Sequence, residues 1–455
     1  MSVPKIKAPR GTFDVLGEQA RARAALEARA RAILEAAGHE RIETPAFEAT
    51  ELFARAVGES TDIVRKEMFT LNDSSGRSLT LRPEGTAPVC RAYVEHGMHK
   101  RRQPVKLWYL SSFFRHERAQ AGRYRQFWQV GAEALGSADP AVDAESIVML
   151  ARLLEEMGVS TVRLRLSSLG GPAARAEYRE RLQGFLREHQ ASLSEEVRAR
   201  IELNPLRAFD SDHEGTKRVM AAAPRLSEHL SEADAEHFAE VCELLGVAKV
   251  PYELDETLVR GLDYYTRTVF EFTSEALGAQ SGVGGGGRYD GLVEALGGPP
   301  APGMGWAAGI ERILLAGGPD RAAAAGGSRP PVASPLELFV ALEEPAAQAP
   351  SGDDNSTGPR DDGRGRSAGA AGIRATRRAA FALLGEARAA GLTAQMELAG
   401  RSLKGQLGHA NSLGARYVAI VADGQTTLRD MQEGGQQEIG TDTVVHAVLQ
   451  GLRTL

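Results

Sequence analysis

The chain has 455 residues, 42% of them hydrophobic and 25% charged, and its formal net charge is −6. This composition is ordinary for globular protein of two or three domains, and the mild acidity argues against a protein that coats nucleic acid without specificity. No apolar run approaches the length of a membrane span, and residues 1–5 contain no apolar signal core, so we expect a cytoplasmic location and no membrane partner. The two cysteines, Cys90 and Cys242, lack metal-site spacing, and we expect no metal ligands.

The first part of the chain predicts a helix, several strands and one basic loop. Apolar spacing and the stop at Gly38 favour a helix, while alternating or continuous apolar residues favour strands. We expect a helix at 18–37, an edge strand or an extended entry segment at 42–47, a strand and Pro-Gly turn at 78–86, a helix at 87–96, and strands at 107–114 and 127–135.

The loop between the last two of these strands is rich in arginine. Residues 100–125 contain eight Lys or Arg and one acidic residue, a local charge of +7 in a chain that carries −6. Basic runs often coat a solvated face, but here the arginines alternate with aromatic residues between two strands. Because the guanidinium fork donates two parallel hydrogen bonds to phosphate oxygens, this pattern favours a polyphosphate or nucleic-acid partner.

The rest of the chain predicts two further regions. Residues 171–247 have few strand signals and indicate a helical insertion, which precedes a strand at 269–272. We interpret 281–290 as a glycine-rich turn that opens a helix, and 303–315 as a second glycine turn that leads into an apolar helix. Beyond a Gly/Ala/Pro-rich linker we expect a small α/β domain, with strands at 336–342, 393–398 and 415–422, helices at 374–391, 402–414 and 441–453, and a hairpin at 426–439.

The glycine-rich run satisfies the dinucleotide-binding pattern letter for letter at Gly282, Gly284 and Gly287. We reject a dinucleotide site because the second strand and the ribose-binding acid of a βαβ unit do not follow. We interpret the run instead as a wall where the backbone approaches a ligand closely.

Several segments together resemble one known family. Residues 114–129 resemble motif 2 of the class II aminoacyl-tRNA synthetases in the form used by the histidyl-tRNA synthetases, with departures at Ala119, where proline is usual, and at Trp128. The same family resemblance extends to motif 1 at 42–47, Arg-Pro-Glu-Gly-Thr at 82–86, the two histidine-specific signatures at 259–266 and 281–290, and motif 3 at 305–312.

The resemblance implies an α+β fold: a class II antiparallel sheet flanked by helices, a helical insertion and a C-terminal α/β anticodon-binding domain. The implied boundaries are 1–325 for the catalytic domain, with its insertion at about 171–247, then a linker at 326–335 and the anticodon-binding domain at 336–455. Within the last domain, residues 344–372 have almost no large apolar side chains, and we expect a disordered insertion there. Motif 1 implies a homodimer.

The resemblance also implies a reaction: ATP-dependent ligation of L-histidine to its tRNA through histidyl-adenylate, with Mg²⁺ accompanying ATP. Its catalytic residues would be Arg115, Arg260 and Arg312, which with Arg123 would also bind ATP. The remaining implied roles are histidine binding by Glu84, Gly85, Thr86, Gln129, Glu133, Tyr264 and Tyr265, and tRNA binding by Arg118 and Gln120.

Two alternatives remain open from sequence. The regulatory subunit of ATP phosphoribosyltransferase shares the catalytic fold, but it typically lacks the C-terminal domain and has eroded histidine signatures. Here those signatures are intact, and about 120 residues follow motif 3. A tRNA-sensing module of a stress kinase is more remote, because the chain has no kinase signature set.

Overall fold

The computed structural model describes residues 5–58, 61–117, 122–159, 161–258, 262–278, 281–317, 336–343, 364–422 and 425–453. The chain divides into two compact units. The first takes its described residues from Met1–Leu34, His39–Cys242 and Val250–Pro330, and the second from Glu35–Gly38, Glu243–Lys249 and Pro331–Leu455. The predicted linker at 326–335 lies outside the described residues.

The first unit is built on an eight-stranded sheet in the order β1-β5-β6-β11-β10-β9-β7-β8. Its five inner pairings are antiparallel, and β1 with β5 and β7 with β8 are parallel. A mainly antiparallel sheet confirms the predicted fold class. The strands are β1 Glu40–Arg41, β5 Val105–Phe114, β6 Gln126–Leu135, β7 Val162–Ser168, β8 Glu253–Leu254, β9 Thr266–Ser274, β10 Gly282–Arg288 and β11 Gly303–Gly309.

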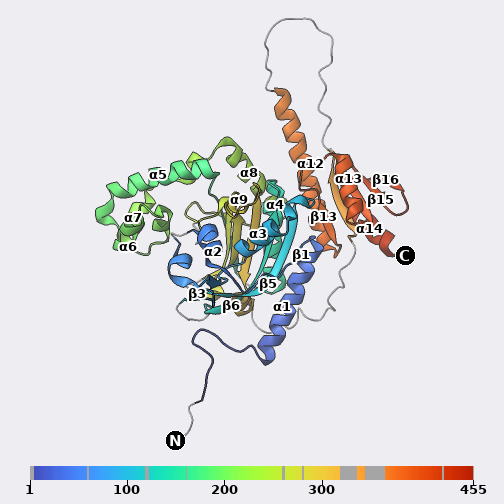
Figure 1. Cartoon of the computed structure of the whole chain (residues 1–455). Helices are drawn as coiled ribbons and strands as arrows, with labels where there is room; N and C mark the ends of the chain where they lie inside the picture. Colours follow the sequence, from blue (N-terminus) through green and yellow to red (C-terminus); the bar gives the residue numbers. More distant parts are fainter. Residues whose placement is uncertain are drawn as a thin grey trace. The chain divides into compact units, whose positions relative to one another are not determined.

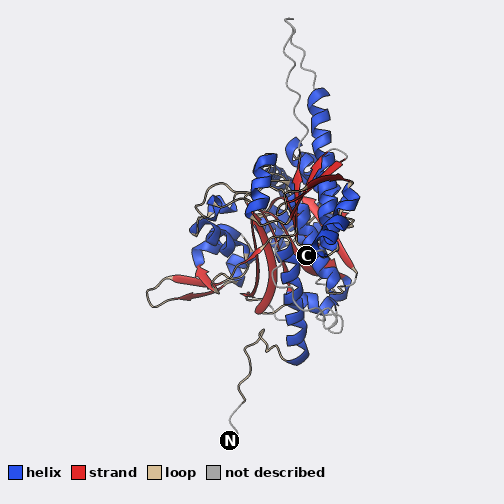
Figure 2. Ribbon diagram, turned by 90° about the vertical axis from the view of Figure 1, so that its right-hand side faces the viewer, coloured by secondary structure: helices blue, strands red, loops and turns tan. Residues whose placement is uncertain are grey.

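Helices flank this sheet (Figures 1 and 2). α4 packs against β9, β10 and β11, and α10 packs against β6, β10 and β11. Alternate residues of β5, namely Val105, Leu107, Tyr109 and Phe113, share one apolar core with α2, α3 and α9, as expected for a strand whose side chains alternate between two faces. The helices outside the insertion are α1 Gly17–Ala36, α2 Thr50–Val57, α3 Thr86–Glu95, α4 Pro140–Glu156, α9 Leu292–Ala295 and α10 Ile310–Gly317.

The predicted helical insertion is present, and its hydrophobic core also includes Tyr265 and, from β9, Val269. Its helices are α5 Pro172–Glu188, α6 Glu195–Arg200, α7 Glu214–Ala221 and α8 Glu232–Val247. A separate three-stranded sheet, in the order β2-β4-β3, lies earlier in the unit and consists of β2 Phe47–Ala49, β3 Phe69–Asn72 and β4 Ser78–Leu81.

The second unit contains a five-stranded sheet in the order β13-β12-β14-β15-β16, parallel from β13 to β14 and antiparallel beyond it. This confirms the expected α/β domain, although its role in anticodon binding stays a prediction. Its elements are β12 Leu338–Leu342, α12 Arg364–Ala389, β13 Ala394–Met396, α13 Leu403–Ser412, β14 Tyr417–Ala422, β15 Gln425–Asp430, β16 Gln436–Ile439 and α14 Val444–Arg453.

Helix α12 begins earlier than the sequence pattern indicates. It starts at Arg364 rather than near residue 374, so residues 364–372 are helical and not part of a disordered insertion. Arginine and alanine favour helix, and a helix already fixed by packing extends at little cost into a segment with few apolar residues. Residues 344–363 lie outside the described residues.

Two other local predictions were wrong, and a third is decided in favour of its second alternative. Residues 42–46 are a connecting segment and not a strand: β1 ends at Arg41 and β2 begins at Phe47, with Pro45, which has no N–H to donate, between them. The two glycine-rich runs are strands β10 and β11 rather than turns. These strands approach so closely that a Cβ on Gly286 would lie 2.0 Å from the carbonyl oxygen of Gly305. Glycine removes the side-chain alternation by which a strand is recognised in sequence.

A buried ion pair ties the sheet to α4. The side chains of Arg288 on β10 and Asp143 on α4 are both fully inaccessible, and Arg288 Nη2 lies 2.7 Å from Asp143 Oδ1. Arg288 also donates to the carbonyl oxygens of Ser137 and Asp139 at 3.0 and 2.9 Å. His237 of α8 lies 2.9 Å from Asp143 through its Nε2, so the cluster reaches the helical insertion.

We predict that Asp143→Ala lowers the free energy of unfolding of the first unit by about 3–5 kcal/mol, because it removes the fully buried counter-charge of Arg288 and leaves only the partly exposed Asp290, 3.5 Å away. The three tryptophans of the chain, Trp108, Trp128 and Trp306, all belong to this unit, so denaturation followed by tryptophan fluorescence reports on it alone. The control is Arg163→Ala, whose pair with Glu275 is 58% and 65% exposed and should cost less than about 1 kcal/mol. Equal losses in the two variants would contradict this account of the cluster.

Candidate active site

A cavity of about 190 Å³ lies where the β5–β6 hairpin meets β10 and α10. The hairpin contributes Arg115 and Arg123, and α10 contributes Arg312, so three guanidinium groups converge on one space, as predicted from the basic loop. The cavity is lined by Arg115, Glu117, Gly122, Arg123, Tyr124, Phe127, Gln129, Glu271, Gly282, Val283, Gly284, Ala307, Gly309, Glu311 and Arg312.

Each of these arginines is anchored by the protein. Arg115 Nε donates to the carbonyl oxygen of Pro83 at 2.9 Å, and Arg312 Nη1 donates to that of Gly122 at 3.4 Å. Glu117 lies 3.9 Å from Arg115 and 3.4 Å from Arg123, which offsets part of their charge. Burial, and next the neighbouring charge of Arg123, lower the pKa of Arg312 from its usual value. Cations held this close favour the binding of an anion with several charges.

A second region, with two buried acidic residues, adjoins the arginine cavity, and its first acidic residue directly precedes the N-terminus of α3. Glu84 is only 4% exposed, and its carboxylate accepts hydrogen bonds from the backbone N–H groups of Thr86 (2.7 Å) and Ala87 (2.9 Å). Burial raises the pKa of Glu84, whereas these two bonds and the charge of Arg115 lower it. Glu84 is therefore a fixed acceptor beside the arginine cavity.

Glu133 on β6 is the most deeply buried acidic group of this region, with no exposed surface. Its Oε1 accepts from the hydroxyls of Thr86 at 2.9 Å and Tyr109 at 3.3 Å, and its Oε2 accepts from the hydroxyl of Tyr289 at 2.7 Å. Burial raises the pKa of Glu133 to about 8, although the three hydroxyl donors oppose this shift. A ligand N–H that donates to Glu133 would stabilise the carboxylate and lower this pKa.

Glycine at three positions makes room for this carboxyl group and its donors. A Cβ on Gly305 of β11 would lie 1.7 Å from Glu133 Oε2. A Cβ on Gly85 or on Gly131 would come within 2.5 and 2.4 Å of the Tyr109 hydroxyl oxygen. At these places the glycines allow polar side chains to stand against the sheet.

Tyr264 and Tyr265 complete the region from the segment that leads into β9. Their rings are 4.8 Å apart, and the Tyr264 hydroxyl donates to Glu84 at 3.4 Å. Gln129 lines the arginine cavity and lies on the same strand as Glu133, and its Oε1 is buried without a hydrogen-bond partner among the described residues. A buried acceptor without a donor suits a ligand that supplies one.

The structure thus brings together most of the predicted site residues, namely Glu84, Gly85, Thr86, Arg115, Arg123, Gln129, Glu133, Tyr264, Tyr265 and Arg312. Three others, Arg118, Gln120 and Arg260, lie outside the described residues. Sequence reasoning missed Tyr109 and Tyr289 as donors to Glu133. A tyrosine hydroxyl within an otherwise apolar strand, as at Tyr109, was the available signal. In the described part of the chain, no group of three or more His, Cys, Asp or Glu side chains could hold a metal ion.

Such a sheet, with arginines converging beside a buried acidic pocket, defines the catalytic domain of a class II aminoacyl-tRNA synthetase. A family model described as histidyl-tRNA synthetase matches residues 11–313, and the chain belongs to this family, whose members use ATP. No described helix is long and apolar enough to cross a membrane.

Similar proteins carry the same description over nearly their whole length. The histidine–tRNA ligases of Rubrobacter xylanophilus and Halorhodospira halophila are 43% and 44% identical to this chain, and the alignments cover 95% and 99% of it and 96% and 99% of those proteins. The crystal structure of apo Staphylococcus aureus histidyl-tRNA synthetase has a TM-score of 0.57 at 31% identity, and the match covers 98% of this chain and 100% of that one. These relatives do not favour the alternative of a phosphoribosyltransferase regulatory subunit.

The raised pKa of Glu133 predicts how stability depends on pH when this residue is changed. In the unfolded chain the carboxyl group loses its proton near pH 4.5, whereas in the folded protein it keeps the proton until about pH 8. Between these values the unfolded state is favoured by ionisation, so the contribution of Glu133 to the free energy of unfolding falls as pH rises.

Glu133→Gln has no such proton to lose. The difference between the free energies of unfolding, variant minus original protein, should therefore increase by up to about 1.4 kcal/mol for each pH unit between pH 5 and 8. Urea denaturation at pH 5, 6.5 and 8, followed by tryptophan fluorescence, measures this difference. A difference that stays constant across the three pH values would contradict the assigned pKa.

Proposed function

We propose that this chain ligates L-histidine to its cognate tRNA in two steps. Histidine and ATP first form histidyl-adenylate and diphosphate, and histidine then passes to the terminal ribose of the tRNA with release of AMP. The observation that carries the proposal is that β6 carries both the buried Glu133, with its hydroxyl donors, and Gln129, which lines the cavity with three arginines. One region suits an imidazole and the other suits a triphosphate.

In the first step, a carboxylate oxygen of histidine attacks the α-phosphate of ATP. Two anions are brought together and charge develops at phosphorus, so fixed cations accelerate this step most. Arg115 would contact the α-phosphate, Arg123 and Arg312 the outer phosphates, and Arg260 would supply a further positive charge. Mg²⁺ would accompany ATP. The substrate carboxylate is already ionised, so the step needs positioning rather than a general base.

The amino acid would be held at both of its ends. Its α-ammonium group needs acceptors, and Glu84, the Thr86 hydroxyl and the unpaired Gln129 Oε1 lie beside the arginine cavity. A neutral imidazole offers one donor and one acceptor. Glu133 would accept from one ring nitrogen and the Tyr265 hydroxyl would donate to the other, while Gly85 and Tyr264 shape the pocket.

The tRNA would meet the protein at two places. Arg118 and Gln120, at the tip of the basic loop, would contact the acceptor end, and the second unit would bind the anticodon. We also propose that the chain forms a homodimer through the region that corresponds to motif 1.

The proposal is tested by exchange of labelled diphosphate into ATP. The protein should catalyse this exchange with histidine and with none of the other nineteen amino acids, and it should then charge tRNA. A regulatory subunit without synthetase activity would give no exchange with any amino acid, and that result would overturn the proposal.

Tyr265→Phe should raise the KM for histidine while leaving the KM for ATP nearly unchanged. Losing one partner of a buried polar pair costs about 1–3 kcal/mol, so the rise should be roughly 5- to 150-fold. Diphosphate exchange at varied histidine and varied ATP measures both constants. If both KM values rose equally, Tyr265 would be a structural residue and would not bind the imidazole.

Arg260→His should abolish most adenylate formation while histidine still binds. Removing a fixed cation from a site of developing charge typically lowers the rate by about 10²–10³. Single-turnover formation of adenylate measures the rate, and isothermal titration with histidine measures the binding. A variant that forms adenylate at a near-normal rate would rule out this role for Arg260.

A further inference from the structure

The two pocket tyrosines are carried by a segment that belongs to no helix or strand. Residues 262–265 lead into β9, which begins at Thr266. Their carbonyl groups are therefore not held by a strand ladder of their own, and other donors must fix the backbone. Arg175 supplies two such bonds, because its Nη1 donates to the carbonyl oxygens of Asp263, at 2.7 Å, and of Tyr265.

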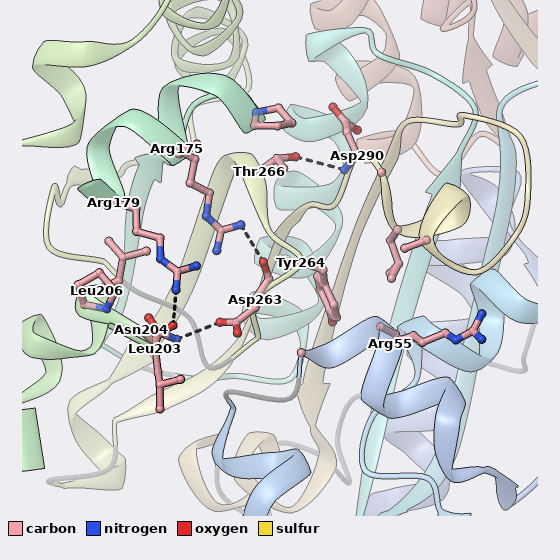
Figure 3. Close-up of a pocket in the computed structure, with 18 residues that line it drawn as sticks. Arg55, Arg175, Arg179, Leu203, Asn204, Leu206, Asp263, Tyr264, Thr266 and Asp290 are labelled. Atoms are coloured by element: carbon pink, nitrogen blue, oxygen red, sulfur yellow. Dashed lines mark hydrogen bonds between the residues drawn. The ribbon is translucent and has the colours of Figure 1, made fainter. Parts of the chain in front are cut away.

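A second side chain holds the same segment from nearby. Asn204 Nδ2 donates to the carboxylate Oδ1 of Asp263 at 3.0 Å, and the backbone N–H of Asp263 donates to the carbonyl oxygen of Val57 at 3.3 Å. Figure 3 shows the hydrogen bonds from Arg175, on α5, and from Asn204 to Asp263. Tyr264, whose hydroxyl contacts Glu84, is thus flanked on both sides by carbonyl groups bound to one guanidinium.

Arg175 and Asn204 both come from the helical insertion. Arg175 lies on α5, and Asn204 directly precedes the short helical turn η4 at Pro205–Asp210. One turn further along α5, Arg179 donates to the carbonyl oxygens of Glu202 and Leu203 at 2.9 and 2.7 Å, which fixes the chain that carries Asn204.

The pocket tyrosines also pack against the insertion. Tyr265, which is 6% exposed, belongs to the same apolar core as Tyr178, Leu182 and Leu186 of α5, and Tyr264 packs against that core. The position of both rings therefore depends on the insertion as well as on the sheet.

A cavity of about 520 Å³ separates the insertion from the core on this side, and Arg175, Arg179, Asn204, Asp263 and Tyr264 all line it (Figure 3). Arg175 and Asn204 reach Asp263 beside this open space, where packing alone holds the segment less firmly. Burial lowers the pKa of Arg175 from its usual value, and the negative charge of the nearby Asp263 opposes part of this shift. Because the donor is a charged guanidinium, its hydrogen bonds to the carbonyl oxygens of Asp263 and Tyr265 are stronger than neutral ones.

We propose that Arg175, assisted by Asn204, is a positioning residue of the active site: it clamps the Asp263–Tyr265 segment so that the helical insertion sets the affinity for the amino acid. The inference rests on the proposed function, since it takes Tyr264 and Tyr265 to be part of the histidine pocket. It adds a requirement that lies outside that pocket, namely an intact link between α5 and the segment before β9.

The test compares Arg175→Met with Arg179→Met in the full-length protein. Both arginines lie on α5, and each donates to two backbone carbonyl groups. The two acceptors of Arg179, however, both belong to the insertion. In diphosphate exchange, Arg175→Met should raise the KM for histidine roughly 10- to 100-fold and change the KM for ATP less than about twofold. Arg179 acts on the clamp only through the chain that carries Asn204, so Arg179→Met should raise the KM for histidine no more than Asn204→Ala does and should leave the KM for ATP within about twofold.

Two further variants keep the test decisive. Asn204→Ala should raise the KM for histidine in the same direction but less, because it removes one neutral bond. Arg175→Lys retains a cation with donors, so its KM for histidine should fall between those of the original protein and Arg175→Met. It also serves if Arg175→Met does not fold. An unchanged KM for histidine in the Arg175 variants, or equal changes for histidine and ATP, would overturn the proposal.

Amide hydrogen exchange tests the clamp without any substrate. In the ligand-free protein, the amides of residues 262–266 should exchange faster in Arg175→Met than in the original protein and in Arg179→Met. Equal exchange in the three proteins would refute the clamp. If the original protein showed no histidine-dependent diphosphate exchange, the proposed function would fail, and this comparison would still decide whether Arg175 holds the segment.

Discussion

A carboxyl group with no access to water is the constraint around which the active site is arranged. Burying Glu133 is costly, and the cost is reduced by hydroxyl groups from three separate elements, α3, β5 and the turn after β10. Those hydroxyls can reach the carboxyl only because glycines stand at Gly85, Gly131 and Gly305. Since the donors are neutral, the carboxyl keeps a raised pKa and remains ready for a further donor from a ligand.

In the neighbouring cavity three positive charges repel one another. Its arginines are held close together by backbone carbonyl groups and by Glu117, so their mutual repulsion is reduced but not removed. An anionic ligand would replace this repulsion with attraction, and the site need not reorganise to receive it. Arg115 and Gln129 line the arginine cavity and link it to the acidic region: Arg115 donates to the residue before Glu84, and Gln129 shares strand β6 with Glu133.

The sequence predicted the chemistry of the site better than its geometry. Residues such as Arg115 and Glu84 could be named as candidates because they stand in motifs whose spacing is specific, whereas Glu133 was implied by the family resemblance alone. The fold class followed from the same motifs, and most helix and strand positions followed from apolar periodicity. Strand β10 could not be recognised, because a run of glycines has no alternation, and its strand state comes from hydrogen bonds to β9 and β11.

Contacts between distant parts of the chain were beyond prediction from one sequence. Tyr289 lies 156 positions from Glu133 in the chain, and Arg175 lies 88 positions from Asp263. Nothing local to Arg175 distinguishes it from Arg179 on the same helix, since both are arginines on a charged surface helix. Only the tertiary structure shows that one of them binds the segment that carries Tyr264 and Tyr265.

The most direct test of the central claim is a crystal structure of the protein with histidine bound. The account predicts that one imidazole nitrogen lies within about 3.2 Å of Glu133 and the other within the same distance of the Tyr265 hydroxyl, as hydrogen bonds require. The α-ammonium group should lie beside Glu84 and Gln129, with the carboxylate directed at Arg115. An imidazole that points away from Glu133, or histidine bound outside this pocket, would contradict it.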